Sequence, residues 1–368
     1  MSLEIQFSEI KNLIVQARNN AFQAVNKEAV LLNWRVGEYV NAKLKTSSWG
    51  DGVVEQLANY LKTQDPTLKG FNKRGIYRMV QFYETYSNDS FLKSVSPQLE
   101  MLENSIVSTV MTQLESSNNQ LNVFVSSVMT QITWTHHLEI LVSCNSAEEK
   151  FFYLLMTKKE RWSVRDLRRH IKTATFERTM LANQQVDQVQ KHIPQDISNV
   201  FRDSYVFEFL NIPELHSEQT LRKTLIKNLS AFMKELGNDF LFVGEEFKLS
   251  VGMQDFYIDL LFYHRDLQCL VAFELKTETF SPQSLAQINF YLEALDRDVK
   301  KTNENPSIGI LLCKGKDDLV VEYALSRSLN PAMIADYQLK LPNKEVLQKK
   351  WQELIELNEN LQGNEFKT

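Results

Sequence analysis

The fold is decided by residues 256–263, which read FYIDLLFY. Seven of these eight residues are aromatic or aliphatic, which is typical of a buried β-strand, and Asp259 is the exception. A carboxylate in a buried strand stays charged only if a cation or strong hydrogen-bond donors replace the water that it has lost. We therefore take Asp259 as a candidate functional residue within a strand of the core.

The next apolar run, VAFELK at residues 271–276, shows the same anomaly. Glu274 and Lys276 are two residues apart, so on a strand they face the same side. If the two runs pair as a hairpin that turns at residues 264–267, Asp259 lies near both of them at one edge of a sheet. A buried salt bridge between Lys276 and an acid is the alternative interpretation.

Two acids and one amine at a sheet edge suit a particular chemistry. Carboxylate oxygens are the ligands that Mg²⁺ prefers, and this ion usually keeps several waters and completes its shell with a phosphate. Mg²⁺ makes a bound water nucleophilic and stabilises the charge on the phosphate under attack. A nearby lysine can orient that water, accept its proton once the lysine pKa is lowered, or stabilise the pentacovalent phosphorus. Asp259 and Glu274 are therefore candidate metal ligands, and Lys276 is a candidate catalytic residue.

The segments around this hairpin alternate in type. An amphipathic helix is expected at about residues 218–236, and a second helix runs from Ser281 to about residue 296. The expected strands are residues 240–244, 246–251, 256–263, 268–277 and 307–313. The order helix, strands, helix, strand predicts an α/β or mixed sheet flanked by helices in the C-terminal half.

The N-terminal half reads as helices. Apolar residues recur at helical spacing over residues 1–86, and a turn at residues 66–70 precedes a third helix at about residues 72–83. This order suits a helix-turn-helix, whose recognition helix would present four residues near its start to phosphates and base edges: Lys73, Arg74, Tyr77 and Arg78. An ordinary pair of helices with polar outer faces is the alternative.

Charge is distributed unevenly along the chain. The net charge is −5, yet residues 150–178 hold nine basic and three acidic residues. Ser163 can cap a helix there, and four basic residues on that helix fall largely on one side: Arg165, Arg168, Arg169 and Lys172. A local basic face attracts phosphate even on an acidic protein, although a solvated helix face is the commoner reason for such a run.

The length of 368 residues predicts two domains. We expect a helical N-terminal domain over residues 1–180, with an inserted segment rich in Ser, Asn and Gln at about 87–132. A polar linker at 181–195 leads to a C-terminal domain over 196–350, and residues 351–368 are expected to form a helical tail.

Composition narrows the class of protein. Hydrophobic residues make up 43% of the chain, but no apolar run is long enough to span a bilayer, and the N-terminus resembles no secretion signal. The three cysteines are widely separated, which argues against a disulfide framework or a cysteine-based zinc site. The adjacent His136 and His137 point apart on a helix, so a shared metal is not expected. We expect a cytoplasmic protein with no membrane partner.

Two motifs resemble those of a known nuclease superfamily. Asp259 followed by Glu274-Leu275-Lys276 resembles the D…(D/E)xK signature of the PD-(D/E)XK nucleases, and QINFY at 287–291 is similar to the QxxxY motif of their RecB-like members. Residues 256–295 resemble the catalytic core of the YhcG-like bacterial PDDEXK nucleases. The N-terminal domain of that family is similar to this chain at four short motifs: NWRVG at 33–37, WG at 49–50, WTHH at 134–137 and WS at 162–163.

The resemblance implies a restriction-endonuclease-like fold and hydrolysis of DNA phosphodiester bonds with Mg²⁺, or with Mn²⁺ in its place, in DNA repair, restriction or defence against mobile elements. It adds Gln287 and Tyr291 to the catalytic residues. The superfamily also often uses a glutamate from the helix before the sheet, and Glu235 near the end of the expected helix is the candidate for that metal ligand. DNA is the implied partner, together with a second copy of the chain or other DNA-processing proteins. The alternative is a catalytically silent nuclease fold that serves as a DNA-binding or assembly subunit of a larger complex.

Overall fold

The computed structural model describes residues 3–46, 49, 51–95, 128–197, 199–326, 328 and 330–365. The chain divides into two compact units, Met1–Ile171 and Lys172–Thr368. Most of the expected insert, residues 96–127, lies outside the described residues. Within the described part of the chain, no helix combines the length and the apolar character needed to cross a lipid bilayer.

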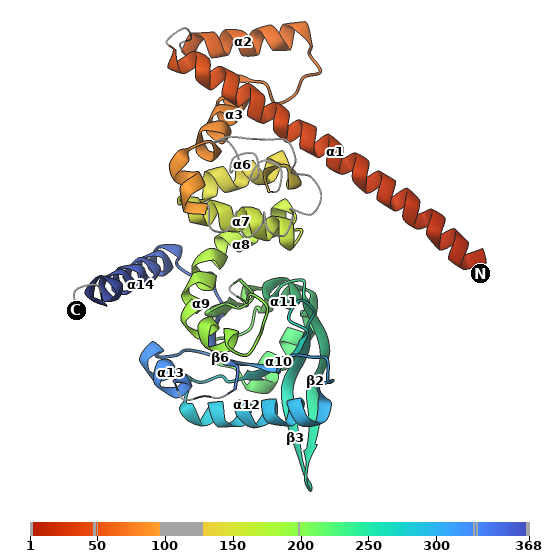
Figure 1. Cartoon of the computed structure of the whole chain (residues 1–368), viewed down its shortest axis with the longest axis vertical. Coiled ribbons are helices and arrows are strands. Elements are labelled where there is room, and N and C mark those ends of the chain that lie inside the picture. The colour runs from red at the N-terminus through yellow and green to blue at the C-terminus, as the bar shows by residue number, and fades with distance from the viewer. Residues whose placement is uncertain are drawn as a thin grey trace. The chain divides into compact units, whose positions relative to one another are not determined.

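The first unit is helical, as the sequence predicted (Figure 1). Its elements are α1 (Leu3–Lys45), α2 (Asp51–Gln64), α3 (Lys73–Tyr86), the 3-10 turn η1 (Met129–Gln131), α6 (Trp134–Ser143), α7 (Ala147–Lys159) and α8 (Val164–Lys172). α3 begins where the sequence placed the third helix, because the Asn72 side chain accepts a hydrogen bond from the Gly75 amide as an N-cap. Its apolar residues then pack along α1.

A glycine lets α1 and α3 approach closely. A Cβ atom built on Gly37 would lie 2.0 Å from the backbone oxygen of Met79, so a larger residue fits only if a helix moves. One turn earlier on α1, Trp34 makes edge-to-face ring contacts with Phe82 and Tyr83 of α3. The NWRVG motif is therefore a packing motif of this helix pair.

The WTHH motif joins the same core. Phe82 contacts the rings of Trp134 and His137, with centroids 5.0 and 4.9 Å away. His137 is fully buried, and burial lowers its pKa to about 4 although its Nε2 is hydrogen-bonded to a backbone carbonyl oxygen. Nε2 of His136 lies 3.0 Å from the carbonyl oxygen of Trp162. The two histidines are thus packing residues with different partners.

The second unit is built on one mixed sheet of six strands (Figure 1). The strands are β1 (Ser204–Val206), β2 (Phe240–Val251), β3 (Gln254–His264), β4 (Cys269–Leu275), β5 (Ile308–Cys313) and β6 (Ala332–Gln338), in the spatial order β1-β6-β5-β4-β3-β2. β2, β3 and β4 form an antiparallel meander, whereas β4, β5, β6 and β1 run parallel. The mixed sheet that the sequence predicted is confirmed.

Helices cover both faces of this sheet. The helical elements of this unit are α9 (Thr175–Gln190), η2 (Glu208–Leu210), α10 (Glu218–Lys227), α11 (Leu229–Leu236), α12 (Pro282–Ala294), the π-helical turn η3 (Leu295–Val299), α13 (Asp318–Leu325) and α14 (Lys344–Glu365), of which α14 packs against α9 rather than the sheet. One core joins α9, α10 and α11 to the sheet, and the other joins α12 and α13 to it. Because both faces are covered, every residue of β4 and β5 is buried, and Glu274 is the one charged residue in these two strands.

Two of the expected elements differ from the structure. The helix expected at residues 218–236 is two helices, because the chain turns at Asn228, between α10 and α11. The strands expected at 240–244 and 246–251 are one strand, β2, with a register shift between Phe242 and Gly244. Residue patterns located both segments, and the local backbone geometry decided their continuity.

The polar stretch that was expected to be a linker is largely helical. α9 extends to Gln190, and the compact units divide earlier, between Ile171 and Lys172. Gln185 ties α9 to the sheet: its side-chain nitrogen donates to the Ile334 carbonyl at 3.0 Å, and its side-chain oxygen accepts from the Ile334 amide at 2.7 Å. A polar composition therefore does not mark an open connection here, since these amide groups pair with strand β6.

Candidate active site

Three carboxylates stand in a row across the antiparallel strands. In the register of β3 and β4, Asp259 stands opposite Glu274, one position beyond the last backbone pair, Leu260 with Phe273. In the register of β2 and β3, Glu246 stands opposite Asp259. The hairpin that the sequence predicted is present and brings the two predicted acids together. Like charges at opposite positions repel each other, so the row needs cations nearby.

Two cations neutralise this row. Nζ of Lys276 lies 2.9 Å from Oε1 of Glu274. Arg222 of α10 binds the other two acids: Nη1 lies 2.9 Å from Oδ1 of Asp259, and Nη2 lies 2.7 Å from Oε1 of Glu246. The predicted trio is therefore one cluster, and an arginine that the sequence did not single out bridges its Asp259 to Glu246.

α10 contributes two side chains to the cluster. Glu218 and Arg222 are four residues apart and so share one face of the helix, next to the face that Leu221 and Leu225 bury. Oε2 of Glu218 lies 3.7 Å from Nζ of Lys276. The only sequence signal for the position of Glu218 and Arg222 was their spacing of four residues beside a pair of core leucines.

The two predicted metal ligands have different surroundings. Oδ2 of Asp259 accepts a hydrogen bond from the Leu275 amide at 2.9 Å, so both oxygens of this carboxylate have donors. Glu274 is only 3% exposed, and its Oε2 is buried with no hydrogen-bond partner. Burial, together with the charge of Asp259, raises the pKa of Glu274 to about 7, although Lys276 acts in the opposite direction.

Lys276 is held as a cation. Burial alone would lower its pKa, but the hydrogen bond to Glu274 and the negative charges of Glu274, Glu218 and Asp259 outweigh burial, so the pKa is raised. Of the three roles that the sequence left open, this favours donating hydrogen bonds and stabilising negative charge over accepting a proton.

The QxxxY motif lies on α12. Nε2 of Gln287 donates to the hydroxyl of Tyr291 at 2.8 Å, as expected for residues one helical turn apart. Burial raises the pKa of Tyr291; the Gln287 hydrogen bond opposes this shift, and the charges of Glu274 and Asp259 add to it. Tyr291 therefore lies within electrostatic reach of the acids, with Gln287 holding its hydroxyl.

The donor set fits a hard divalent cation such as Mg²⁺. A buried carboxylate oxygen without a partner costs about 1–3 kcal/mol, and a cation at Oε2 of Glu274 would remove that cost. Among the described residues, no three His, Cys, Asp or Glu side chains are close enough to enclose a metal by themselves. Mg²⁺ does not require such a cage, because it keeps several waters and binds phosphate oxygens. Asp259 and Glu274 are the residues that would hold it.

Glu235, the expected third metal ligand, has a different role. It is fully buried and its Oε1 lies 2.6 Å from Nη1 of Arg178, which is fully buried as well. The same oxygen accepts a hydrogen bond from the Val206 amide at 3.0 Å. Glu235 thus holds α9 and β1 to α11, and the glutamate that a helix before the sheet brings next to Lys276 is Glu218. The assignment of Glu235 to the metal site is therefore wrong.

The residues predicted to bind DNA lie on two helices of the first unit, and several already have protein partners. On α3, Arg74 is exposed, Lys73 pairs with Glu55 at 3.1 Å, and half-buried Tyr77 packs against the apolar cluster under the helix. The Ser163 cap of α8 is confirmed by its hydrogen bonds with Asp166. On α8, Arg168 makes two hydrogen bonds to Glu139. Arg165 and Lys172 of this helix are exposed, whereas Arg169 is half-buried. Arg78 of α3 is half-buried as well.

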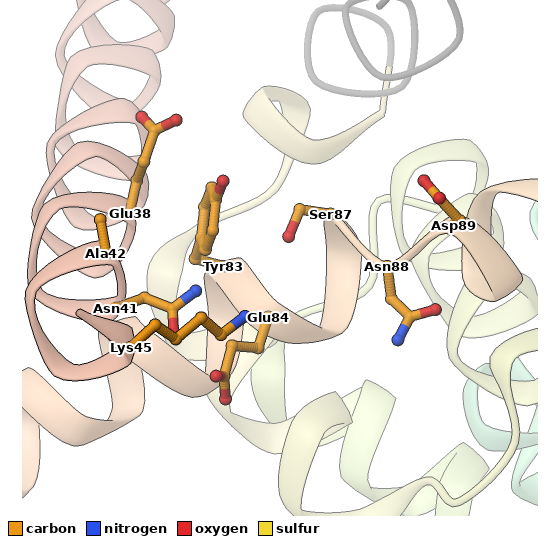
Figure 2. Close-up of a pocket in the computed structure, with 9 residues that line it drawn as sticks. All are labelled: Glu38, Asn41, Ala42, Lys45, Tyr83, Glu84, Ser87, Asn88 and Asp89. Atoms are coloured by element: carbon orange, nitrogen blue, oxygen red, sulfur yellow. The ribbon is translucent and has the colours of Figure 1, made fainter. Parts of the chain in front are cut away.

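A pocket of about 830 Å³ lies in the first unit, between α1 and the end of α3 with the residues that follow it (Figure 2). Its lining consists of Glu38, Asn41, Ala42, Lys45, Tyr83, Glu84, Ser87, Asn88 and Asp89. Burial and the charge of Glu38 raise the pKa of Tyr83. With three acids and one lysine, the lining carries a net negative charge that repels phosphate. This pocket is therefore not expected to receive DNA.

The two halves of the chain match two described domains. Residues 9–178 match the DUF1016 N-terminal domain, and residues 198–352 match the YhcG PDDEXK nuclease domain. Over 347 residues the chain is 29% identical to the Escherichia coli (strain K12) protein named "Putative nuclease YhcG", an alignment that covers 92% of this chain and 90% of that protein.

Solved structures give a weaker likeness. A repair endonuclease from Pyrococcus abyssi is 15% identical, with 35% of this chain and 49% of that chain covered at a TM-score of 0.24. EndoMS in its apo form is 16% identical, with 36% and 49% covered at a TM-score of 0.23. The chain spans about half the length of these structures, and no conclusion is drawn from TM-scores this low.

The active-site geometry and the two matches agree on both halves of the chain. The second unit carries the acids and the lysine of the D…(D/E)xK signature as one cluster at the C-terminal end of β4, an inner strand of the sheet. The first unit gathers the NWRVG and WTHH motifs in one core. The chain therefore carries a DUF1016 N-terminal domain followed by a YhcG PDDEXK nuclease domain, in agreement with its resemblance to the YhcG-like PDDEXK nucleases.

Proposed function

We propose that this protein hydrolyses phosphodiester bonds of DNA in a reaction that depends on Mg²⁺, with Mn²⁺ able to replace it. The observation that carries the proposal is the cluster of Asp259, Glu274 and Lys276, in which a buried oxygen of Glu274 has no hydrogen-bond partner. The name of the E. coli relative, a nuclease, supports it. The setting in DNA repair, restriction or defence against mobile elements, and the cytoplasmic location, stay predictions.

Each residue of the cluster has a part in this reaction. Asp259 and Glu274 would hold the divalent ion, which would supply an activated water and stabilise charge on the phosphate. The Leu275 amide fixes the orientation of Asp259. Lys276, held as a cation, donates hydrogen bonds to the attacking water and to the phosphate oxygen that gains charge.

Two further contributions complete the site. Glu218 of α10 helps to position Lys276, with its Oε2 3.7 Å from the amine nitrogen. Tyr291, whose hydroxyl accepts a hydrogen bond from Gln287, keeps its own proton to donate to the DNA or to an acid of the site. The first unit binds the DNA backbone through the exposed basic residues of α3 and α8.

A cleavage assay with matched variants tests the proposal. Supercoiled, linear, branched and single-stranded DNA are incubated with the protein in Mg²⁺, in Mn²⁺ and in EDTA. Wild type cleaves at least one substrate with metal and none in EDTA, and Asp259→Asn and Glu274→Gln do not cleave. Asp255→Asn is the control, because Asp255 lies on the same strand in an exposed pair with Lys248. A folded wild type that cuts none of these substrates with either metal contradicts the proposal.

A further inference from the structure

Arg222 makes contacts that conflict with metal binding at Asp259. Its Nη1 is hydrogen-bonded to Oδ1 of Asp259, while the Leu275 amide uses the other oxygen of that carboxylate. A divalent ion on the same carboxylate would stand within a few ångströms of the guanidinium. Two positive charges this close together in a poorly solvated site repel each other strongly. Arg222 and a metal ion therefore compete for Asp259.

The second contact of Arg222 is the weaker one. Its partner Glu246 is 59% exposed, and ion pairs at such positions contribute about 0–1 kcal/mol. Glu246 also has a left-handed backbone, with φ of 44°, just past the register shift of β2. Bulges and irregular backbone of this kind often lie beside functional sites. Arg222 is thus held mainly by Asp259.

The guanidinium is built to bind a second group with two oxygens. The Arg222 side chain is only 12% exposed, and its Nε is buried with no hydrogen-bond partner. A planar fork of N–H donors fits a carboxylate or a phosphate in the same way. The contact with Asp259 leaves the Nε donor of Arg222 unused. Another arrangement of the guanidinium would therefore satisfy more of its hydrogen-bond donors.

The charges of the cluster allow the exchange. Four carboxylates meet two cations there: Glu218, Glu246, Asp259 and Glu274 with Arg222 and Lys276. The excess of negative charge equals the charge of one divalent ion. When such an ion is bound, Arg222 is no longer needed to neutralise Asp259, and its charge is available to a phosphate.

We propose that Arg222 is the phosphate-binding residue of this site, paired with Asp259 in the metal-free protein and turned to a phosphate oxygen of DNA once Asp259 holds a metal ion. This rests on the proposed function, since it names the group of the substrate that the site receives. The competing interpretation is a structural ion pair that holds α10 to β2 and β3 in every state.

The test has two measurements. Mn²⁺ binding is measured without DNA, from the electron paramagnetic resonance of free Mn²⁺. The binding of a double-stranded oligonucleotide is measured in Ca²⁺ and in EDTA. Losing a charge-assisted contact with Asp259 should let Arg222→Gln bind Mn²⁺ roughly tenfold more tightly than wild type. The same variant should bind the oligonucleotide roughly tenfold more weakly in Ca²⁺ and equally well in EDTA. Arg297→Gln, which removes an exposed arginine paired with Glu293, should match wild type throughout.

Unchanged or weaker Mn²⁺ binding by Arg222→Gln overturns the exchange, and so does a loss of DNA affinity that is equal in Ca²⁺ and EDTA. If Arg222→Gln does not fold, Arg222→Lys decides: it keeps the charge but not the fork, so DNA binding in Ca²⁺ must weaken while Mn²⁺ affinity stays near wild type. Equal DNA binding by Arg222→Lys counts against the proposal. A wild type that binds no Mn²⁺ contradicts the proposed function itself, whereas normal Mn²⁺ binding with an unaffected Arg222→Gln contradicts only the role of Arg222.

Discussion

Nη1 of Arg222 lies 2.9 Å from Oδ1 of Asp259, and this ion pair gives a predicted metal ligand a structural role as well. The side chains are 12% and 14% exposed, so neither charge is well solvated without the other. Truncating Asp259 therefore changes both the chemistry of the site and the stability of the metal-free fold. The sequence alone, which shows an isolated acid in an apolar strand, gave no sign of the second effect.

The two effects separate in a pair of variants. Asp259→Asn keeps one of the two acceptor oxygens used by the Leu275 amide and Arg222, whereas Asp259→Ala removes both. We expect neither variant to cleave DNA, and we expect Asp259→Ala to be less stable than Asp259→Asn by about 1–3 kcal/mol. Urea unfolding without metal measures the difference. Equal unfolding free energies for the two variants would show that Arg222 does not depend on Asp259.

Glu218 and Glu235 should respond in opposite ways. Glu218→Gln, at a half-exposed position beside Lys276, is expected to slow cleavage by about 10–100-fold with little effect on stability. Glu235→Ala leaves the fully buried Arg178 without its carboxylate and is expected to destabilise the fold by about 3–5 kcal/mol. Thermal unfolding and cleavage rates are measured on both. A stable but inactive Glu235→Ala protein would restore Glu235 as a catalytic candidate.

The raised pKa of Glu274 predicts how the metal-free protein responds to pH. Its carboxyl binds a proton more tightly in the folded state, with a pKa of about 7, than at the ordinary value of 4.5. Its contribution to stability is therefore fully present below pH 4.5 and is lost as the pH rises to about 7, by up to roughly 3 kcal/mol. Glu274→Gln removes this dependence, so its stability relative to wild type should increase between pH 5 and pH 8. A constant difference over that range speaks against the shift.

The sequence predicts those site residues whose signal is local in the chain, and it misses those that only the tertiary structure brings together. Asp259, Glu274 and Lys276 can be recognised from the sequence alone, because they are charged residues that interrupt apolar runs. The short turn between the two runs forces the runs to pair as strands. Arg222 and Glu246 lie in segments where charged residues are ordinary, and they meet only because of the β2 bulge and the docking of α10. Their partnership is a property of the tertiary structure.

Glu235 shows the converse failure. The family resemblance implied a glutamate from a helix before the sheet, and the single helix expected at residues 218–236 hid the division at Asn228. Only the structure shows that Arg178, 57 residues away, encloses Glu235, while Glu218 at the start of α10 reaches Lys276.

The first unit should bind DNA electrostatically through α3. Arg74→Ala combined with Arg78→Ala is expected to weaken binding and to reduce the salt dependence of log K by about two, since about two fewer counterions are released. Lys45→Ala removes a positive charge from the acidic pocket instead and should leave binding unchanged. Titrations at several salt concentrations measure the slope. Equal slopes for wild type and the double variant would assign α3 to protein partners.

The central claim, that the Asp259–Glu274–Lys276 cluster is catalytic rather than structural, is tested most directly by Lys276→Met. Methionine keeps much of the apolar stem, and Lys248→Met on β2 is the control for the same change in an exposed pair. Single-turnover cleavage in Mg²⁺ and thermal unfolding are measured on one preparation at pH 8, where Glu274 is charged. We predict a loss of cleavage by roughly two to four powers of ten with a fold close to wild type in stability. A stability loss of roughly 3–5 kcal/mol, with activity reduced only in proportion to the unfolded fraction, would contradict the account.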